Sequence, residues 1–145
     1  MWDAENGLKS WQESGRLSFS YFSSDNAKEY MHKAEEQAAT SKLAASETVR
    51  TVRLGMLLKE VQARCQHVLL LDQSEGPSVC PNALHVIRYA VAKADNFWGS
   101  WSILRFSRGV SGMLLPCAEL EHLGGFVLEQ AGVASFENLV DMWFS

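Results

Sequence analysis

The pattern of apolar and polar positions changes along the chain from narrow apolar stripes to one stretch that is apolar on nearly every side. Residues 30–45, 84–101 and 119–127 carry apolar side chains three and four positions apart. This spacing places them on one face of an α-helix. The stretch 95–115 has charge in its middle only at two arginines. A helix that is apolar all round must be wrapped by other helices, so we expect 95–115 to be the central helix of a soluble α-bundle.

The stretch 95–115 is also close to the length of about 20 residues that crosses a membrane. Arg105 and Arg108 would each cost several kcal/mol in lipid, and three glycines interrupt the stretch. We therefore favour a buried bundle helix. A segment that enters a membrane under special conditions is the second interpretation.

Start signals for helices divide the first half of the chain. Asn26 followed by Glu29 has the spacing of a capping box and predicts a helix to about residue 40. Ser46 is placed to cap a second helix that runs to about residue 71. Gly55 lies inside this helix, where glycine costs about 1 kcal/mol relative to alanine. We explain it by close contact with a neighbouring helix.

The second half is divided by prolines and glycines. After a loop at 72–81, a helix leads into the central stretch, which ends at Pro116. Pro116 opens a further helix that Gly124-Gly125 weakens and Gly132 ends, and Ser135 caps the last one. The pattern predicts an all-α fold of six or seven helices in a single domain, 1–145. The N-terminal segment 1–23 fits a short amphipathic helix or a lone strand.

Composition supports a packed globule and excludes some functions. Of 145 residues, 47% are apolar, and the net charge is −4. The basic residues at 42–64 are interleaved with acids, which is typical of a solvated helix face and not of nucleic-acid binding. The odd cysteine count, at Cys65, Cys80 and Cys117, fits a reducing compartment. We expect neither a secretory signal nor a tail anchor, and hence a cytoplasmic protein.

Two patterns fit metal binding, but simpler explanations are favoured for both. Paired glutamate and histidine three positions apart suit a di-iron bundle, and clustered cysteine and histidine suit zinc. The residues concerned are Glu29, His32, Glu119 and His122 for iron, and Cys65, His67, Cys80 and His85 for zinc. We interpret the former as chance matches and the latter as buried thiols and ordinary histidines. No arrangement indicates catalysis, so we expect no enzyme, metal or cofactor.

Three short motifs resemble the homology regions of the Bcl-2 family. ADNFWGSWSILRFSRGV, at 94–110, is similar to the first region through Trp98-Gly99 and Gly109. FVLEQAGVASFENL, at 126–139, resembles the second, and TVRLGMLL, at 51–58, resembles the third through Gly55. The resemblance implies a Bcl-2-like bundle of six to eight helices around a central apolar helix.

The chain departs from the family pattern at several motif positions. Ser100 stands where the signature arginine is expected, Phe97 replaces its asparagine, and Met56 replaces the aspartate of the third region. Either Arg105 or Arg88 supplies the positive charge of the missing signature arginine, or ligand binding does without that charge. The compact chain resembles virus-encoded pro-survival members.

The resemblance implies an inhibitor of apoptosis that sequesters pro-apoptotic BH-3 helices in an apolar groove, with Bim-like ligands foremost. It implies a location in the cytosol, that of the host if the source is a virus, and at the mitochondrial surface through partners. A homodimer stays open. The predicted groove residues are Leu54, Leu58, Gln62, Cys65, Leu69, Ile87, Arg88, Val91, Trp98, Gly99, Ser100, Ile103 and Arg105.

Two other classes stay open beside this one. A pro-death member of the same fold would use the central apolar stretch, expected as a helical hairpin, to enter a membrane. A helical adaptor or metal-binding bundle would be unrelated to apoptosis.

Overall fold

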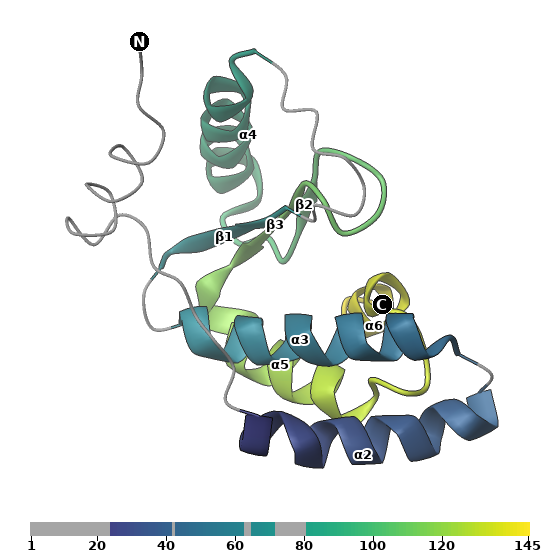
Figure 1. Cartoon of the computed structure of the whole chain (residues 1–145). Coiled ribbons are helices and arrows are strands. Elements are labelled where there is room, and N and C mark those ends of the chain that lie inside the picture. The colour runs from purple at the N-terminus through teal and green to yellow at the C-terminus, as the bar shows by residue number, and fades with distance from the viewer. Residues whose placement is uncertain (1–23, 42, 63–64, 72–80) are drawn as a thin grey trace, which may run out of the picture.

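The computed structural model of the chain describes residues 24–41, 43–62, 65–71 and 81–145. The predictions for segment 1–23, for most of the loop 72–81 and for Cys80 lie outside this part. Figure 1 shows the elements in chain order. They are α2 (Ser24–Ser41), α3 (Ala45–Val61), β1 (His67–Leu70), α4 (Ala83–Trp98), β2 (Leu104–Arg105), β3 (Met113–Pro116), the 3-10 helix η3 (Cys117–Glu119), α5 (Leu120–Glu129) and α6 (Phe136–Trp143).

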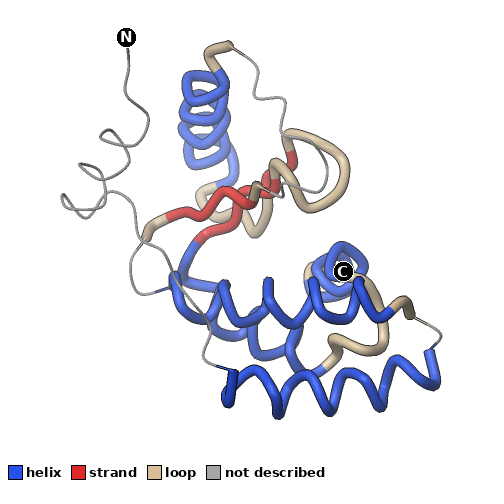
Figure 2. Tube along the Cα trace, viewed as in Figure 1, coloured by secondary structure: helices blue, strands red, loops and turns tan. Residues whose placement is uncertain are grey.

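The described elements fall into two groups. Helices α2, α3, α5 and α6 pack together, and the three strands lie between this helical group and α4 (Figures 1 and 2). The segment from β1 to β3 is thus an excursion inserted between α3 and α5. The fold is mostly helical, as predicted, but it also contains a small antiparallel sheet in the order β1-β3-β2. The expectation of an all-α fold is therefore wrong in this respect.

The main core lies where the helical group meets the sheet. Leu58 from α3, Leu115 from β3, Leu123 from α5 and Phe136 from α6 are all almost completely buried in it. A second cluster, around Ala34, joins α2 to α3 and α5. Both clusters include residues of α3 and α5, so these two helices form the common element of the structure.

Helices α3 and α5 approach each other through glycine. A Cβ atom on Gly124 would lie 3.0 Å from the carbonyl oxygen of Gly55 and 2.7 Å from Cγ of Lys59. A Cβ on Gly55 would lie 2.9 Å from Cγ of Leu128. The close contact expected from the mid-helix Gly55 is confirmed. Gly124 does not interrupt α5, because the missing side chain is what lets the two backbones pack.

The central helix predicted at 95–115 is wrong. Helix α4 ends at Trp98, and the remainder is a loop followed by the hairpin of β2 and β3, in which Leu104 pairs with Leu114. Gly99, Gly109 and Gly112 have φ values of 65°, 76° and 84°. These are left-handed conformations, which glycine adopts without the steric cost of a side chain. The glycines that seemed to interrupt a helix therefore define its end and the hairpin turn.

Strand β3 explains why the apolar run misled the helix prediction. Met113, Leu114 and Leu115 are all buried, and β3 is the middle strand of the sheet. A strand covered on both faces has no polar alternation, and periodicity alone cannot distinguish it from a buried helix.

The second predicted helix is also too long. It ends at Val61 instead of 71, and its last part is β1, which pairs antiparallel with β3 from His67↔Pro116 to Leu70↔Met113. The helix begins at Ala45, with Ala44 rather than Ser46 at its N-cap position. Pairing with β3 satisfies backbone groups that a further turn of helix would have satisfied locally.

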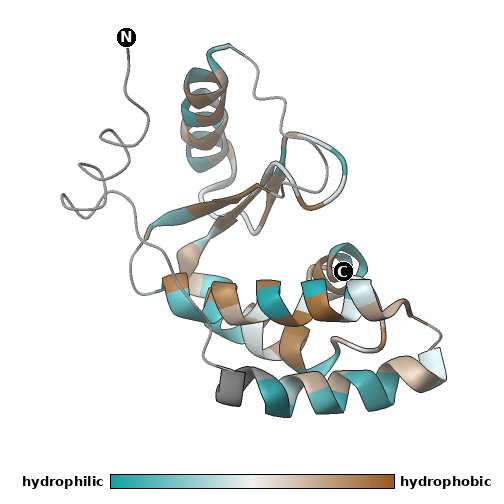
Figure 3. Cartoon of the chain, in the orientation of Figure 1, coloured by the Kyte–Doolittle hydropathy of each residue, from teal (hydrophilic) through white to brown (hydrophobic). Residues whose placement is uncertain are grey.

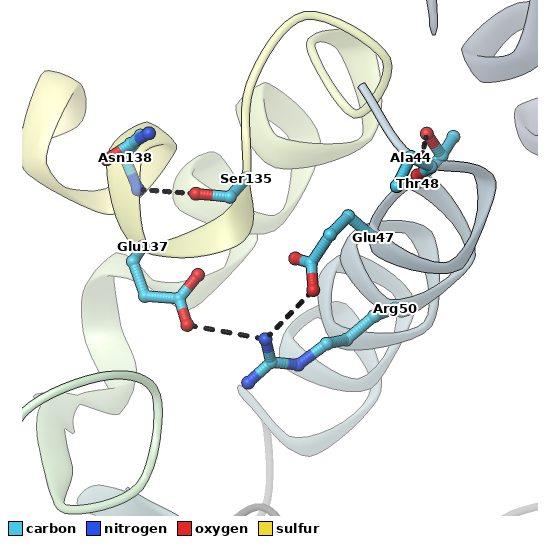
Figure 4. Close-up of polar contacts among 7 residues, drawn as sticks. All are labelled: Ala44, Glu47, Thr48, Arg50, Ser135, Glu137 and Asn138. Carbon is cyan, nitrogen blue, oxygen red and sulfur yellow. Dashed lines mark hydrogen bonds and ion pairs between the residues drawn. The ribbon is translucent and has the colours of Figure 1, made fainter. Parts of the chain in front are cut away.

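Two helices agree well with their predicted bounds. The helix expected to end near residue 40 is α2, and Ser135 caps α6 by accepting a hydrogen bond from the Asn138 backbone N–H at 3.5 Å (Figure 4). Gly132 does not directly end α5, which stops at Glu129. It instead packs against α2, where a Cβ would overlap the Ala34 carbonyl oxygen.

A disulfide closes the base of the excursion. Cys65, just before β1, is bonded to Cys117, just after β3, across a separation of 52 residues. The backbone N–H of Cys117 also donates to the Gln66 carbonyl oxygen at 2.9 Å. The expectation of a buried free thiol is therefore wrong for Cys65.

We predict that replacing both Cys65 and Cys117 with Ser lowers the free energy of unfolding by about 2–4 kcal/mol, because the bond removes loop entropy from the unfolded chain. Urea denaturation measures this loss. Dithiothreitol should destabilise the wild type by a similar amount and leave the double variant unchanged. A wild type that is insensitive to the reductant would contradict the prediction.

The neighbouring glycines of α5 give a matched pair of substitutions. Gly124→Ala should destabilise the protein by about 1–3 kcal/mol, because a methyl group must push α3 and α5 apart. Gly125→Ala should stabilise it by about 0.5–1 kcal/mol, since a Cβ there meets nothing within 4 Å and alanine favours helix. Thermal unfolding of both variants checks the pair, and equal effects would rule out the crossing as the cause.

Candidate helix-binding surface

Helix α4 carries more exposed large apolar side chains than any other described helix or strand. Among its residues only Ala94 is fully buried. Figure 3 shows hydrophobic residues along the length of this helix, at the opposite end of the molecule from α2. Five large apolar side chains face solvent on either side of the helix face that contains Ala94, namely Leu84, Val86, Tyr89, Phe97 and Trp98. Apolar surface concentrated in this way marks a site of interaction.

These side chains form two separate flanks. Successive residues of a helix turn by about 100°, so positions seven apart lie close to one line. Leu84, Val91 and Trp98 have this spacing, and Ile87 lies beside them; we call these four residues the Leu84 flank. Val86, Tyr89, Lys93 and Phe97 lie roughly on the opposite side and form the Tyr89 flank.

Trp101 ties the C-terminal end of α4 to the sheet. Its Nε1–H donates to Oδ1 of Asp95 at 2.8 Å, and its ring stacks on His67 with centroids 5.2 Å apart and planes within 7°. Asp95 belongs to α4 and His67 to β1, so one side chain bridges the helix and the strand. This contact fixes where α4 presents its flanks.

The structure does not bring the predicted groove residues onto one surface. Leu58 is fully buried in the core, and Leu54 packs against the same core. Cys65 is held in its disulfide, while Gln62 and Leu69 are half-buried at the end of α3 and in β1. These five predicted groove residues are therefore either in the core or half-buried.

Five further predicted groove residues, on α4 and directly after it, lie closer to the surface. Ile87 and Val91 are half-buried on the Leu84 flank, and Trp98 is exposed at its end. Gly99 and Ser100 follow immediately and are exposed, and a Cβ on Gly99 would meet nothing within 4 Å. This part of the predicted site is an accessible, continuous surface.

The remaining predicted residues take different environments. Ile103 packs on the main core. Arg105, in β2, is hydrogen-bonded and ion-paired to Asp141 of α6, which secures the hairpin to the helical group. Arg88 is exposed on the polar side of α4. Of the two arginines considered for charge recognition, Arg105 is thus engaged by a carboxylate of the same chain.

Arg50 of α3 also serves an internal contact. Nη1 of Arg50 lies 3.6 Å from Oε1 of Glu47 and 3.4 Å from Oε1 of Glu137 in α6 (Figure 4). The guanidinium group thereby links α3 to α6, and the charge interleaving read from the sequence corresponds here to ion pairs.

The two candidate metal patterns do not form sites in the described part of the chain. Glu29, His32, Glu119 and His122 are exposed, and His32 lies 3.9 Å from Glu36. The disulfide removes Cys65 from the zinc set. No group of three or more histidine, cysteine, aspartate or glutamate side chains is arranged to hold a metal among the described residues.

Comparisons with known proteins give no relative of this chain, so the exposed surface of α4 is the basis on which a function can be proposed. No family model, curated protein or solved structure matches the chain. Within the described residues, none of the helices combines the length and the apolar character that a membrane span requires.

Sequence reasoning missed the residues that are most exposed. The three-four spacing of apolar residues places Leu84 on the face that packs in the core, and Phe97 is interpreted as a position of the first motif, so neither is expected to be exposed. The signal that distinguishes them is the number of apolar positions on α4. The apolar positions cover more of the helix surface than the narrow face around Ala94, which is the part that is fully buried.

We predict that Trp101→Phe, which keeps an aromatic ring but loses the N–H, increases amide exchange within α4 about fivefold. This corresponds to a lost hydrogen bond worth about 1 kcal/mol at an exposed site. Hydrogen exchange followed by mass spectrometry measures it. Asp95→Asn, which retains an oxygen acceptor, should keep the wild-type rate, and unchanged exchange in Trp101→Phe would refute the tie.

Proposed function

We propose that this protein is a helix-binding module that sequesters an amphipathic helix of a partner protein, of the pro-apoptotic BH-3 type, on the Leu84 flank. The observation that carries the proposal is the exposure of large apolar side chains on this flank. Leu84 is 75% exposed and Trp98 is 67% exposed, at either end of α4.

The dimensions of the flank suit a helical ligand. Leu84 and Trp98 are 14 residues apart, so the flank extends for about 21 Å at 1.5 Å per residue. An amphipathic ligand helix presents apolar side chains at i, i+3 or i+4, and i+7, which occupy a strip of comparable length. The open space at Gly99 would let the ligand backbone approach where a side chain would prevent it.

The BH-3 identity of the ligand rests on the motif resemblance. That resemblance depends on Gly55, on Trp98-Gly99 and on the segment 126–139. The segment 126–139 runs from α5 into α6 through a turn. The expected central helix does not support the proposal, because that segment is a hairpin.

The role proposed is stoichiometric capture. The Leu84 flank offers apolar contact, and Arg88 and Ser100 lie beside it as polar groups that can set the ligand's register. Capture hides the ligand's apolar face from its own target, so inhibition would need one copy of this protein for each ligand.

Calorimetric titration with a panel of BH-3 peptides tests the proposal. We expect one-to-one binding by at least one peptide. Leu84→Glu and Trp98→Glu should weaken it more than tenfold, about 1.4 kcal/mol, because each buries a charge against an apolar ligand face. The matched control is Val86→Glu, which places the same charge on the opposite flank and should bind like the wild type.

The outcomes separate the functional classes. Binding that Val86→Glu abolishes and Leu84→Glu leaves unchanged would move the ligand site to the other flank. A folded, helical protein that binds none of the peptides would overturn BH-3 capture and favour an adaptor of another specificity.

A further inference from the structure

The Tyr89 flank is distinct from the proposed ligand surface. Val86 is 53% exposed, Tyr89 62% and Phe97 73%, although all three are large apolar residues. They lie at spacings of three and eight along one side of α4, with Lys93 between the two rings. The exposed stripe covers about three turns and has the spacing of a helix that packs on another helix.

Lys93 is the single charged residue within this stripe. Its Nζ lies 5.9 Å from the centroid of the Tyr89 ring and 5.8 Å from that of Phe97. Both distances are within the range of a cation–π contact. The stripe is therefore an apolar and aromatic surface with one central cation and no acidic residue.

We propose that the Tyr89 flank is a self-association surface, on which α4 packs antiparallel against α4 of a second copy of this chain. This goes beyond the proposed ligand binding, because it uses the other side of the helix and does not depend on any ligand.

Self-complementarity is the argument for a second copy. In a two-fold pair every contact occurs twice, so residue i must suit residue j and the reverse. A two-fold axis that crosses the Tyr89 flank at the level of residue 91 along the helix places Lys93 opposite Tyr89 of the other copy and Phe97 opposite Val86, from both directions. Each ammonium then meets a ring, and the apolar ends meet each other.

The same stripe argues against a parallel pair. Parallel packing in register would place Lys93 directly opposite its own copy, with no ring of the partner facing either ammonium group. The antiparallel arrangement offsets the two lysines by about four residues, roughly 6 Å along the axis, and sets each against a ring, so it is the more favourable of the two.

The expected dimer is weak. About three turns of helix bury much less than the roughly 1,600 Å² of a standard interface, so we expect a dissociation constant on the order of 100 µM. The Leu84 flank stays free in this arrangement, so that a dimer could still bind two ligand helices.

Sedimentation equilibrium of the full chain over a range of concentrations tests the dimer. The wild type should pass from monomer to dimer, and Val86→Glu and Phe97→Glu should each raise the dissociation constant at least tenfold. Leu84→Glu is the control for added charge on the opposite flank and should dimerise like the wild type. A wild type that stays monomeric well above 100 µM, or equal loss in all three variants, would overturn the proposal.

A cross-linking experiment tests the orientation. In a Cys80→Ser background, Tyr89→Cys and Lys93→Cys proteins are mixed and treated with a short bismaleimide reagent. The antiparallel pair predicts a cross-linked dimer in the mixture and much less in either protein alone. Efficient cross-linking of Lys93→Cys to itself would refute the antiparallel orientation. These outcomes are independent of peptide titration, so failure of the dimer and failure of ligand capture are distinguishable.

Discussion

The close approach of α3 and α5 is the constraint on which the rest of the structure depends. Gly124 and Gly55 let the two backbones meet, and the helices on either side are placed by that contact. Leu128 of α5 joins the α2 cluster, while Leu123 of the same helix joins the main core. One helix pair therefore connects both hydrophobic clusters, and the protein interior tolerates little change in volume at their junction.

The excursion between α3 and α5 is held at its base and projects α4 from the helical group. The disulfide, the β1–β3 pairing and the Arg105–Asp141 ion pair all act near the sheet. Further from the helical group, Trp101 connects α4 to β1 through its hydrogen bond to Asp95 and its stacking on His67. This arrangement combines a firmly closed base with a helix that has little apolar cover, and it accounts for the exposure on which both proposed surfaces rest.

The two flanks of α4 divide the proposed functions by chemistry. The Leu84 flank is apolar and ends at an open glycine, as suits a ligand helix whose backbone comes close. The Tyr89 flank carries aromatic rings around a single lysine, which suits a partner offering the same groups in reverse order. A helix that is buried along one line and apolar on both sides of it can serve two partners at once.

The sequence by itself determined the elements whose signals are local. Helix α2, the Ser135 cap and the close contact at Gly55 follow from spacing, capping chemistry and helix propensity, and the three-four spacing also places Ile87, Val91 and Trp98 near one another on α4. Tertiary structure decided the rest. The run at 113–115 is a central strand, the end of the second predicted helix is its partner, and Leu58 lies in the core and not in a groove. The physical reason is that a continuous apolar run satisfies a buried helix and a buried strand equally well, and only pairing with residues far away in the chain distinguishes them.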